Sequence, residues 1–505
     1  MTLRLREHLG ADFAYKITSS RKNADVIWGL DSNYIHDLSI VAEDDETIRN
    51  GCFKVREGDD MGWLGRFIGQ CTSLLSLYIG DFPVDADQIN KFLEGLNRNR
   101  SIQLLEIGHD RGDEMLEKLS SFFRNNKSIC SLSLAYFDIG HESAGKLAST
   151  ILCDTPLIHL ALRRNELCNE GFEKIVTAAS GVQSQITNLC VAWNNVGQVG
   201  CATLLRSGAL NKLKELDLMD NNIDDNSLQT LAAGLMNNTT LEQLDLSGNP
   251  SITANGLTYL VPFLQSQSCP LTSFHFNTIY IDDLCAAVLA HGLSKNKSLK
   301  RLWFDPSNCG MTSTGWQSFA TLLCDMSSIN NTYLSNHTIE LIGASEGSPV
   351  NQVHERVKAL LRMNANANSR EIAKRKIFLN HPDLNVEPMF EWGLKFLPWI
   401  VTWFGKIYEY DMLPSIFNTR CSELSVVYKF IRGMPPKTAE CYWQQFATNA
   451  QAKRQKIEDE TRRLDRERLR LHHEEEAAWA RLGGRPGIDG SSANRVGGSK
   501  RMRQE

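Results

Sequence analysis

A short apolar phrase that returns about every 28 residues constrains this chain more than any other feature of its sequence. The phrase has the form L-x-x-L-x-L, and good copies read LIHLALRRNEL (157–167), LKELDLMDNNI (213–223) and LEQLDLSGNPSI (241–252). Ten copies begin 27–30 residues apart, at Leu74, Ile102, Ile129, Leu157, Ile186, Leu213, Leu241, Leu271, Leu299 and Ile329. A period of this length fits one short strand and one helix, so the stacked units are expected to form a solenoid.

The residues of one copy have separate structural roles. In the sixth copy Leu213, Leu216 and Leu218 are expected to enter the core, because successive side chains of a strand alternate between its faces. Asn221 stands where the chain leaves the strand, and its side-chain amide can bond backbone groups that the turn leaves unpaired. Further copies repeat this asparagine and add a glycine where the helix should begin, at Asn165, Asn194, Asn249, Gly171, Gly200 and Gly256.

The spacing of asparagine and glycine in LRRNELCNEG (162–171) and VAWNNVGQVG (191–200) resembles the ribonuclease-inhibitor type of leucine-rich-repeat proteins. The resemblance covers about 74–345. It implies an α/β horseshoe solenoid with a parallel sheet on the concave side and helices on the convex side. It also implies that the usual use of this fold is to bind another protein. No cofactor is expected.

The sequence outside the regular array suggests caps. Residues 1–73 are interpreted as an N-terminal cap with an atypical repeat at 34–40 that carries an insertion near 42–51. Residues 74–345 hold ten repeats, and 346–450 are expected to form a helical C-terminal cap. Within that cap the aromatic segment 387–404 is apolar on all sides, as is typical of a buried helix; insertion at a membrane surface is the alternative.

The last part of the chain differs in composition. Residues 451–482 alternate charges and favour a solvated helix, with self-association through half a coiled-coil seam as the alternative. Residues 483–505 are rich in glycine, serine and basic residues and are expected to be disordered.

Charge and cysteine usage limit the function classes. The chain has 54 basic and 59 acidic residues, a net charge of −5, and its basic excess falls after 450, so the body should repel nucleic acid. The N-terminus lacks the apolar core of a secretory signal, and no apolar run is long enough to span a bilayer. The 13 cysteines include no C-x-x-C pair, which favours reduced thiols over a metal site. We therefore expect a cytoplasmic monomer without a metal, with the nucleus as the open alternative compartment.

The candidate binding residues are those that strand alternation turns away from the core. Aromatic anchors and charges of this kind are typical of protein interfaces. The candidates are Tyr136, Arg163, Arg164, Trp193, Glu215, Asp217, Asp220, Asp245, His275, Trp303 and Tyr333. The carboxylates come from adjacent strands and should concentrate negative potential at the middle of the face, which favours a basic protein or peptide as partner. A solvated face without a partner is the alternative.

The sequence thus predicts a non-enzymatic intracellular scaffold. The second hypothesis is a regulator resembling the Ran GTPase-activating proteins, which use this repeat type and present an arginine to a GTPase. Arg163 and Arg164, after the fourth strand, are the candidate arginines, although the acidic tail of that family has no counterpart here. Motifs for nucleotide binding, hydrolase, zincin or calcium chemistry are absent from the sequence.

Overall fold

The computed structural model describes residues 18–381, apart from 19, 46–50, 57–58, 81–84, 109–111, 150–154, 278, 307–308, 344–352 and 366–367, and six single positions between 455 and 474. The chain divides into two compact units, of which the first is Met1–Pro382 with Met412–Asn418. The second is described only at the single positions, all of them helical. The segments 387–404 and 483–505 and most of 451–482 lie outside the described residues.

Within the first unit, twelve described strands form one parallel sheet in the order β12-β11-β10-β9-β8-β7-β6-β5-β4-β3-β1-β2. Neighbouring repeats pair in register, so that Leu216 lies opposite Leu189 on one side and Leu244 on the other. The strands are β1 Asp37–Ala42, β2 Cys52–Val55, β3 Ser76–Ile79, β4 Leu104–Gly108, β5 Ser131–Ala135, β6 His159–Ala161, β7 Asn188–Cys190, β8 Glu215–Asp217, β9 Gln243–Asp245, β10 Ser273–His275, β11 Arg301–Trp303 and β12 Leu341–Gly343.

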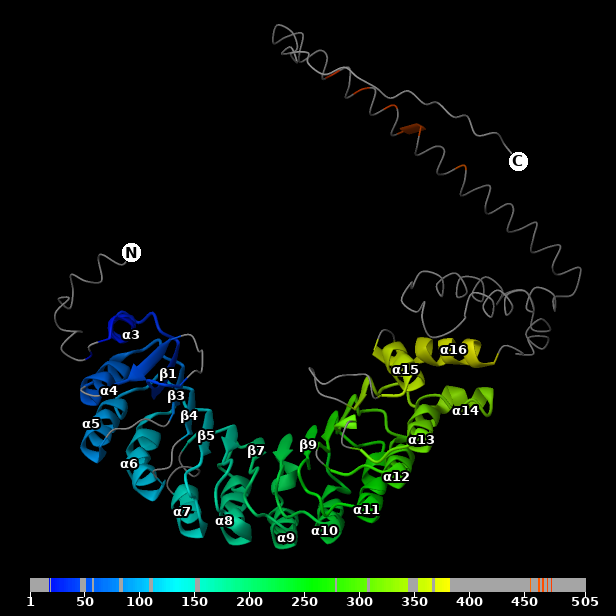
Figure 1. The fold of residues 1–505 in the computed structure, drawn as a ribbon, viewed down its shortest axis with the longest axis horizontal. Helices are drawn as coiled ribbons and strands as arrows, with labels where there is room; N and C mark the ends of the chain where they lie inside the picture. The colour runs from blue at the N-terminus through cyan, green and yellow to red at the C-terminus, as the bar shows by residue number, and fades with distance from the viewer. Residues whose placement is uncertain are drawn as a thin grey trace, which may run out of the picture. The chain divides into compact units, whose positions relative to one another are not determined.

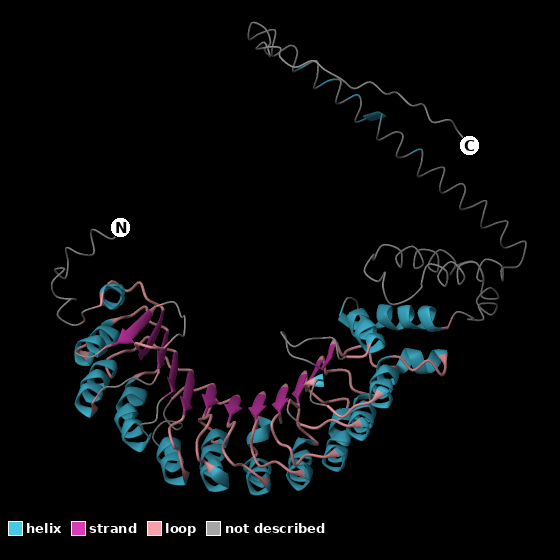
Figure 2. Cartoon of the chain, in the orientation of Figure 1, coloured by secondary structure: helices cyan, strands magenta, loops and turns pink. Residues whose placement is uncertain are grey.

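Helices follow the strands and lie on the outer side of the curved array, while the sheet lines its inner side (Figures 1 and 2). None of the described helices is both long and apolar enough to cross a membrane. The predicted horseshoe solenoid is confirmed. The helices are α3 Arg21–Asp31, α4 Met61–Gln70, α5 Ala86–Leu96, α6 Gly112–Asn125, α7 His141–Leu147, α8 Cys168–Ser180, α9 Gln198–Ser207, η2 Ala209–Asn211, α10 Asp225–Leu235, α11 Ala254–Gln265, α12 Asp283–Leu293, α13 Ser313–Leu323, α14 Ile329–Leu334, α15 Glu355–Ala365 and α16 Ser369–Asn380.

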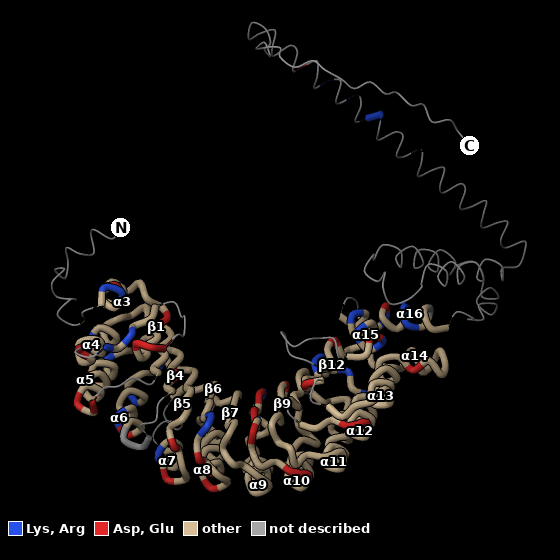
Figure 3. The backbone as a smooth tube through the Cα atoms, viewed as in Figure 1, with Lys and Arg blue, Asp and Glu red and all other residues tan. Residues whose placement is uncertain are grey.

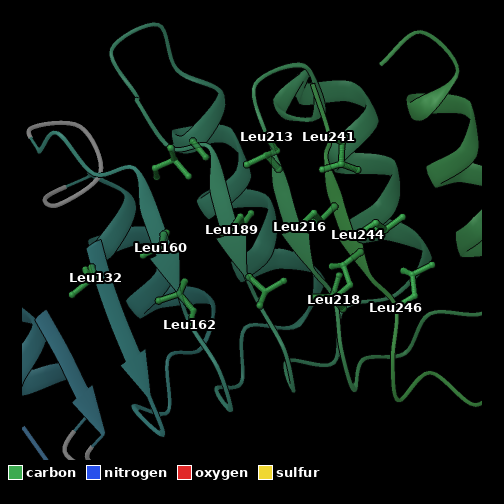
Figure 4. Close-up of a cluster of buried hydrophobic side chains, with 14 of the residues drawn as sticks. Leu132, Leu160, Leu162, Leu189, Leu213, Leu216, Leu218, Leu241, Leu244 and Leu246 are labelled. Atoms are coloured by element: carbon green, nitrogen blue, oxygen red, sulfur yellow. The ribbon is translucent and has the colours of Figure 1, made fainter. Parts of the chain in front are cut away.

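The leucines of the repeated phrase form one continuous core between sheet and helices. Leu216 and Leu244 are 1% exposed and Leu302 is fully buried, as the strand alternation predicts. Figure 4 shows the equivalent leucines of neighbouring repeats standing in rows across the strands. Each such side chain stabilises the fold by about 1.5–3 kcal/mol relative to an exposed one.

The turn asparagines form a buried ladder, as predicted. The amide nitrogen of Asn221 donates to the carbonyl oxygens of Val191 and Met219, both at 3.0 Å. Its Oδ1 accepts from the backbone N–H groups of Asn194 at 3.1 Å and Val196 at 2.9 Å. One side chain therefore satisfies backbone groups of its own repeat and of the preceding one. Equivalent bonds are made by Asn165, Asn194 and Asn249.

A second asparagine ladder stands just before the strands. The Oδ1 of Asn238 accepts from the N–H groups of Thr240 at 3.0 Å and Leu241 at 2.8 Å, and its Nδ2 donates to the carbonyl of Leu210 at 2.6 Å. Asn296 makes the same set of bonds two repeats further on. Where it occurs, this asparagine therefore fixes the register at which the following strand begins.

The same ladder corrects the position of the last repeat. The Oδ1 of Asn336 accepts from the N–H groups of Thr338 and Ile339, at 2.9 and 3.1 Å, so the phrase of β12 begins at Ile339. The predicted start, Ile329, instead opens helix α14 and is 42% exposed. The prediction was wrong because α14 is inserted between α13 and β12, and its first residue has the apolar character and the spacing of a repeat start.

At the N-terminal end, a strand follows directly after the insertion predicted near 42–51. β1 pairs with β3 on one side and with β2 on the other, both in parallel. The segment after β1 thus contributes an additional edge strand, β2, whose Phe53 and Val55 enter the core.

Helices α15 and α16 cover the C-terminal end of the core. Val357 is fully buried in the core beside Val353, and Ile372 of α16 is 1% exposed. The Nδ2 of Asn364 donates to the carbonyl of Ile339 at 2.7 Å, so the end of α15 takes the place of the next rung of the second ladder.

A buried lysine joins α16 to the last repeat. The ammonium of Lys376, fully buried, lies 2.6 Å from the carbonyl oxygen of Leu323, 3.2 Å from that of Asn336 and 3.1 Å from Nδ1 of His337. Burial lowers the pKa of Lys376 to about 7 despite these acceptors.

Candidate functional site

Most of the predicted binding residues lie on the concave side of the sheet. Trp193, His275 and Trp303 are partly buried there, and Tyr136 is 51% exposed. Tyr333 does not join them, because it lies in α14 and not on a strand, as the corrected position of the last repeat requires.

Arg164 is held between two aromatic rings. Its guanidinium carbon lies 5.2 Å from the centroid of the Tyr136 ring and 4.7 Å from that of the Trp193 ring. Its Nη1 also donates to the Tyr136 hydroxyl at 2.5 Å. We call these three residues the arginine stack. Such cation–π contacts contribute about 0.5–1 kcal/mol each at exposed sites and fix the orientation of the cation.

The arginine stack belongs to a row of residues with left-handed backbone. Each follows its strand by three residues or fewer, and its N–H continues the hydrogen bonding of the sheet, as Arg164 does to the carbonyl of Ala192 at 2.9 Å. The row, with its φ angles, is Tyr136 (61°), Arg164 (53°), Trp193 (56°), Asp220 (48°) and Gly248 (68°). Only glycine adopts this conformation without steric cost, so the row orients four side chains at the expense of backbone strain.

Arg163 points to a different partner from Arg164. Its Nη2 lies 3.5 Å from Oδ2 of Asp217, and its Nε donates to the sulfur of Cys190 at 3.0 Å. The Cys190 thiol donates to the same Asp217 oxygen at 2.8 Å, and burial, followed by the Asp217 charge, raises its pKa to about 12. Cys190 was not among the predicted site residues, although strand alternation places it on this face. As a protonated thiol it serves as a hydrogen-bond donor and not as a nucleophile.

The predicted carboxylates are brought together over β8 and β9. We call Glu215, Asp217, Asp220 and Asp245 the acidic patch. Asp217 and Asp245 lie opposite each other in register. Figure 3 shows acidic positions beside β9 and a basic position near β6 and β7.

One carboxylate oxygen of Asp217 and one of Asp245 accept backbone hydrogen bonds. Oδ1 of Asp217 accepts from the N–H of Met219 at 3.0 Å, and Oδ1 of Asp245 accepts from that of Ser247 at 2.8 Å. Burial raises the pKa of Asp220; Arg164 opposes this shift, and the charges of Asp245 and Asp217 add to it. The patch is therefore a cluster of like charges whose neutralisation by a cation would be favourable.

His275 lies between the acidic patch and Trp303. Its Nε2 lies 2.8 Å from the Ser273 hydroxyl, its Nδ1 lies 3.8 Å from Oδ2 of Asp245, and its ring centroid lies 5.8 Å from that of Trp303. Burial lowers the pKa of His275, against the opposing charge of Asp245. The order Ser–His–Asp resembles a hydrolase triad. However, Ser273 is only 3% exposed and 3.8 Å is too long for a hydrogen bond, so substrate access and the relay between His275 and Asp245 are both missing.

The structure also bears on the two arginines of the GTPase-activating hypothesis. A catalytic arginine has to reach the phosphates of a nucleotide bound to another protein. Arg163 is paired with Asp217, and Arg164 is hydrogen-bonded to the Tyr136 hydroxyl, so both are engaged within the concave face. Within the described ranges, histidine, cysteine, aspartate and glutamate side chains nowhere gather in a group of three that could hold a metal ion.

Comparison with known proteins agrees with this architecture. A family model described as Leucine Rich repeat matches residues 209–232 and 237–261. The chain is 25% identical over 256 residues to ribonuclease inhibitor from Sus scrofa. This alignment covers 50% of this chain and 53% of that protein. It is 28% identical over 188 residues to NACHT, LRR and PYD domains-containing protein 5 from Homo sapiens. This alignment covers 37% of this chain and 16% of that protein. The match thus spans about half or less of each of these relatives.

Two solved structures also align with the chain. An internalin from Listeria monocytogenes aligns with a TM-score of 0.33 and 16% identity over 60% of this chain and 93% of its own. The complex of Rad7 and Elc1 in yeast aligns with a TM-score of 0.33 and 14% identity over 57% of this chain and 74% of the matched chain.

Proposed function

We propose that this leucine-rich-repeat protein, which resembles the ribonuclease-inhibitor type, is a non-enzymatic interaction scaffold that binds a protein or peptide on its concave face. The observation that carries the proposal is the arginine stack, in which three side chains of interface type are fixed in orientation on strained backbone. Tryptophan, tyrosine and arginine are enriched among the few residues that dominate the binding energy of protein interfaces. Orienting them before binding reduces the entropy that association costs.

The partner's contact segment is proposed to be basic where it meets the acidic patch. Asp217 is already paired with Arg163, so Asp220 and Asp245 are the carboxylates on which a partner cation would act most. Trp303, next to His275, offers a partly buried apolar contact beside the patch. Exposed charges of one sign mainly accelerate encounter, whereas the aromatic contacts slow dissociation.

The proposed scaffold acts in the cytoplasm or nucleus and has no catalytic step of its own. The concave nucleophile candidates support this reading, because Cys190 holds its proton with a pKa of about 12 and Ser273 is buried. Repeat solenoids commonly use their extended concave surfaces for binding, and the similar protein from Sus scrofa is an inhibitor by name.

Affinity capture with matched variants tests this function. Three baits would be used in extract of cells that naturally make the protein. They are the full chain, its Trp193→Ala/Trp303→Ala variant and the convex control Tyr259→Ala. Tyr259 is 42% exposed on α11. We expect a protein that is retained by wild type and by the control and lost from the concave variant. Retention by all three baits would contradict the proposal. Chain 1–450 used in parallel shows whether the tail contributes.

A further inference from the structure

The left-handed row gives the strongest indication of what the concave face recognises. Gly248 shows that the fold accepts glycine at this position, where φ is 68°. The three preceding repeats nevertheless carry Arg164, Trp193 and Asp220 there, and Tyr136 stands one repeat earlier. Strained backbone of this kind persists at sites where the side chain is used.

Arg164 carries donors that the fold does not use. Among the described residues, its side chain makes one hydrogen bond, to the Tyr136 hydroxyl, and no carboxylate lies within ion-pair distance. Arg163, by contrast, pairs with Asp217 at 3.5 Å. A guanidinium has five N–H groups, so Arg164 retains unused donors while its guanidinium carbon lies against the Tyr136 and Trp193 rings. A planar edge of this type matches a carboxylate, which it can bind through two parallel hydrogen bonds.

The charge of the row changes sign over a short distance. Asp220 occupies the position of Arg164 two repeats further along, beside Asp217 and Asp245. Adjacent strands are about 4.8 Å apart, so two to three spacings are roughly 10–14 Å, which an extended peptide covers in about three to four residues. A segment lying across the strands would therefore meet a cation and then an acidic patch within a few residues.

We propose that Arg164, held by Tyr136 and Trp193, binds a carboxylate side chain of the partner, and that a lysine or arginine about three to four residues away in the same extended segment meets the acidic patch. This inference rests on the proposed concave-face function and specifies the partner's chemistry. A carboxylate fits better than a phosphate ester, because the nearby Asp217 and Asp220 repel a dianion more strongly than a monoanion.

Peptide selection tests the inference even while the partner is unidentified. The probe is a phage-displayed library of random short peptides, selected on the full-length chain and on Arg164→Glu. We expect wild type to enrich peptides with Asp or Glu at a fixed distance from Lys or Arg. Arg164→Glu should instead enrich a basic residue at the first position. If Arg164→Glu loses only the acidic preference and still selects Lys or Arg at the second position, the variant has kept its fold and Arg164 recognises the acidic residue.

Affinities of one enriched peptide then quantify the contact. Arg164→Gln should weaken binding at least about tenfold, while Arg164→Lys should weaken it less because it keeps the charge but loses the planar edge. Arg206→Gln is the matched control, since Arg206 is exposed on convex α9 with its side chain 64% accessible. It should leave the affinity unchanged. A phosphoserine replacing the acidic residue should bind more weakly than the carboxylate.

The outcomes distinguish failure of the carboxylate assignment from failure of the proposed function. If the enriched peptides lack a fixed acidic position, if Arg164→Gln binds them as wild type does, or if phosphoserine binds more tightly, the carboxylate assignment is wrong. The concave-face function would still stand if Trp303→Ala weakens the same peptide. If no peptide is enriched, or if none of the concave substitutions changes binding, the proposed function fails and the inference fails with it.

Discussion

A β-carbon added to Gly248 would lie 2.3 Å from a carboxylate oxygen of Asp220, the residue at the same place in the preceding repeat. The two residues share a left-handed backbone, with φ of 68° and 48°. The absence of a side chain at Gly248 therefore makes room for the carboxylate of Asp220 and ends the row of oriented side chains.

Asp220→Gly should raise the free energy of unfolding by up to about 1 kcal/mol. It relieves about 1–2 kcal/mol of left-handed backbone strain, which exceeds the extra conformational entropy that glycine gives the unfolded chain. Burial raises the pKa of Asp220 in the folded state, so ionisation of this carboxyl opposes folding at neutral pH. The gain in the free energy of unfolding, measured with urea, should therefore be larger at pH 7 than at pH 3. Gly248→Ala should have the opposite sign, and a destabilised Asp220→Gly would show that the carboxylate supports the turn.

Asn221→Ala should destabilise the array by about 2–4 kcal/mol, because it leaves several buried backbone groups without a partner. These include the carbonyl of Val191 and the N–H of Val196. The neighbouring Asn222 is exposed, so Asn222→Ala is the control and should change stability by less than about 0.5 kcal/mol. Urea unfolding followed by circular dichroism measures both. Equal effects of the two substitutions would argue against the ladder as a main source of stability.

Repeat spacing alone predicted most of the fold, because the apolar phrase and its asparagine determine the strand, the turn and the direction of the core. Leu216 and Asn221 occupy their predicted environments. The prediction failed where a short helix was inserted before β12, since Ile329 has the right character at nearly the right spacing. Asn336, three residues before Ile339, is the residue that marks the true register.

The candidate site was predicted as a set of residues but not as an arrangement. Alternation placed Arg164 and Trp193 on one face, but the ring contacts depend on left-handed φ angles at non-glycine residues, which sequence patterns do not encode. The pairing of Arg163 with Cys190 and Asp217 likewise depends on the lateral distance between repeats. The residue spacing within a single repeat cannot predict contacts between side chains of neighbouring repeats.

Lys376→Met should destabilise the C-terminal cap in a pH-dependent way. The pKa of Lys376 is about 7 in the folded chain and near its ordinary value of 10.5 when unfolded, so between these values the folded state binds fewer protons. Through this group, wild-type stability should rise with pH across that window, by on the order of 1 kcal/mol per pH unit. The Met variant lacks this contribution and also leaves the Leu323 carbonyl unpaired. Urea unfolding at pH 7 and pH 9.5 should show that wild type gains free energy of unfolding relative to Lys376→Met as the pH rises. If the free energies of unfolding of the two proteins change equally with pH, Lys376 does not have the lowered pKa.

Charge and aromatic substitutions on the concave face should change different rate constants. Asp220→Asn/Asp245→Asn should slow association and flatten its salt dependence, and the amide at 245 can still accept from the Ser247 N–H. Trp303→Ala should mainly speed dissociation, by a factor corresponding to about 1–2 kcal/mol. Surface plasmon resonance with the captured partner separates the two rates. Unchanged kinetics in both variants would move the binding site off this face, with segment 451–482 as the next candidate.

The most direct test of the central claim is site-specific photo-crosslinking of the full-length chain in extract of the producing cells. A benzophenone amino acid would replace Gln243, which is exposed on strand β9 of the concave face, or Tyr259, which is 42% exposed on the convex helix α11. We predict one defined crosslinked protein from position 243 that is absent at position 259 and lost when Arg164→Gln is added. Equal crosslinking from both positions, or a product from position 259 alone, would contradict binding at the concave face.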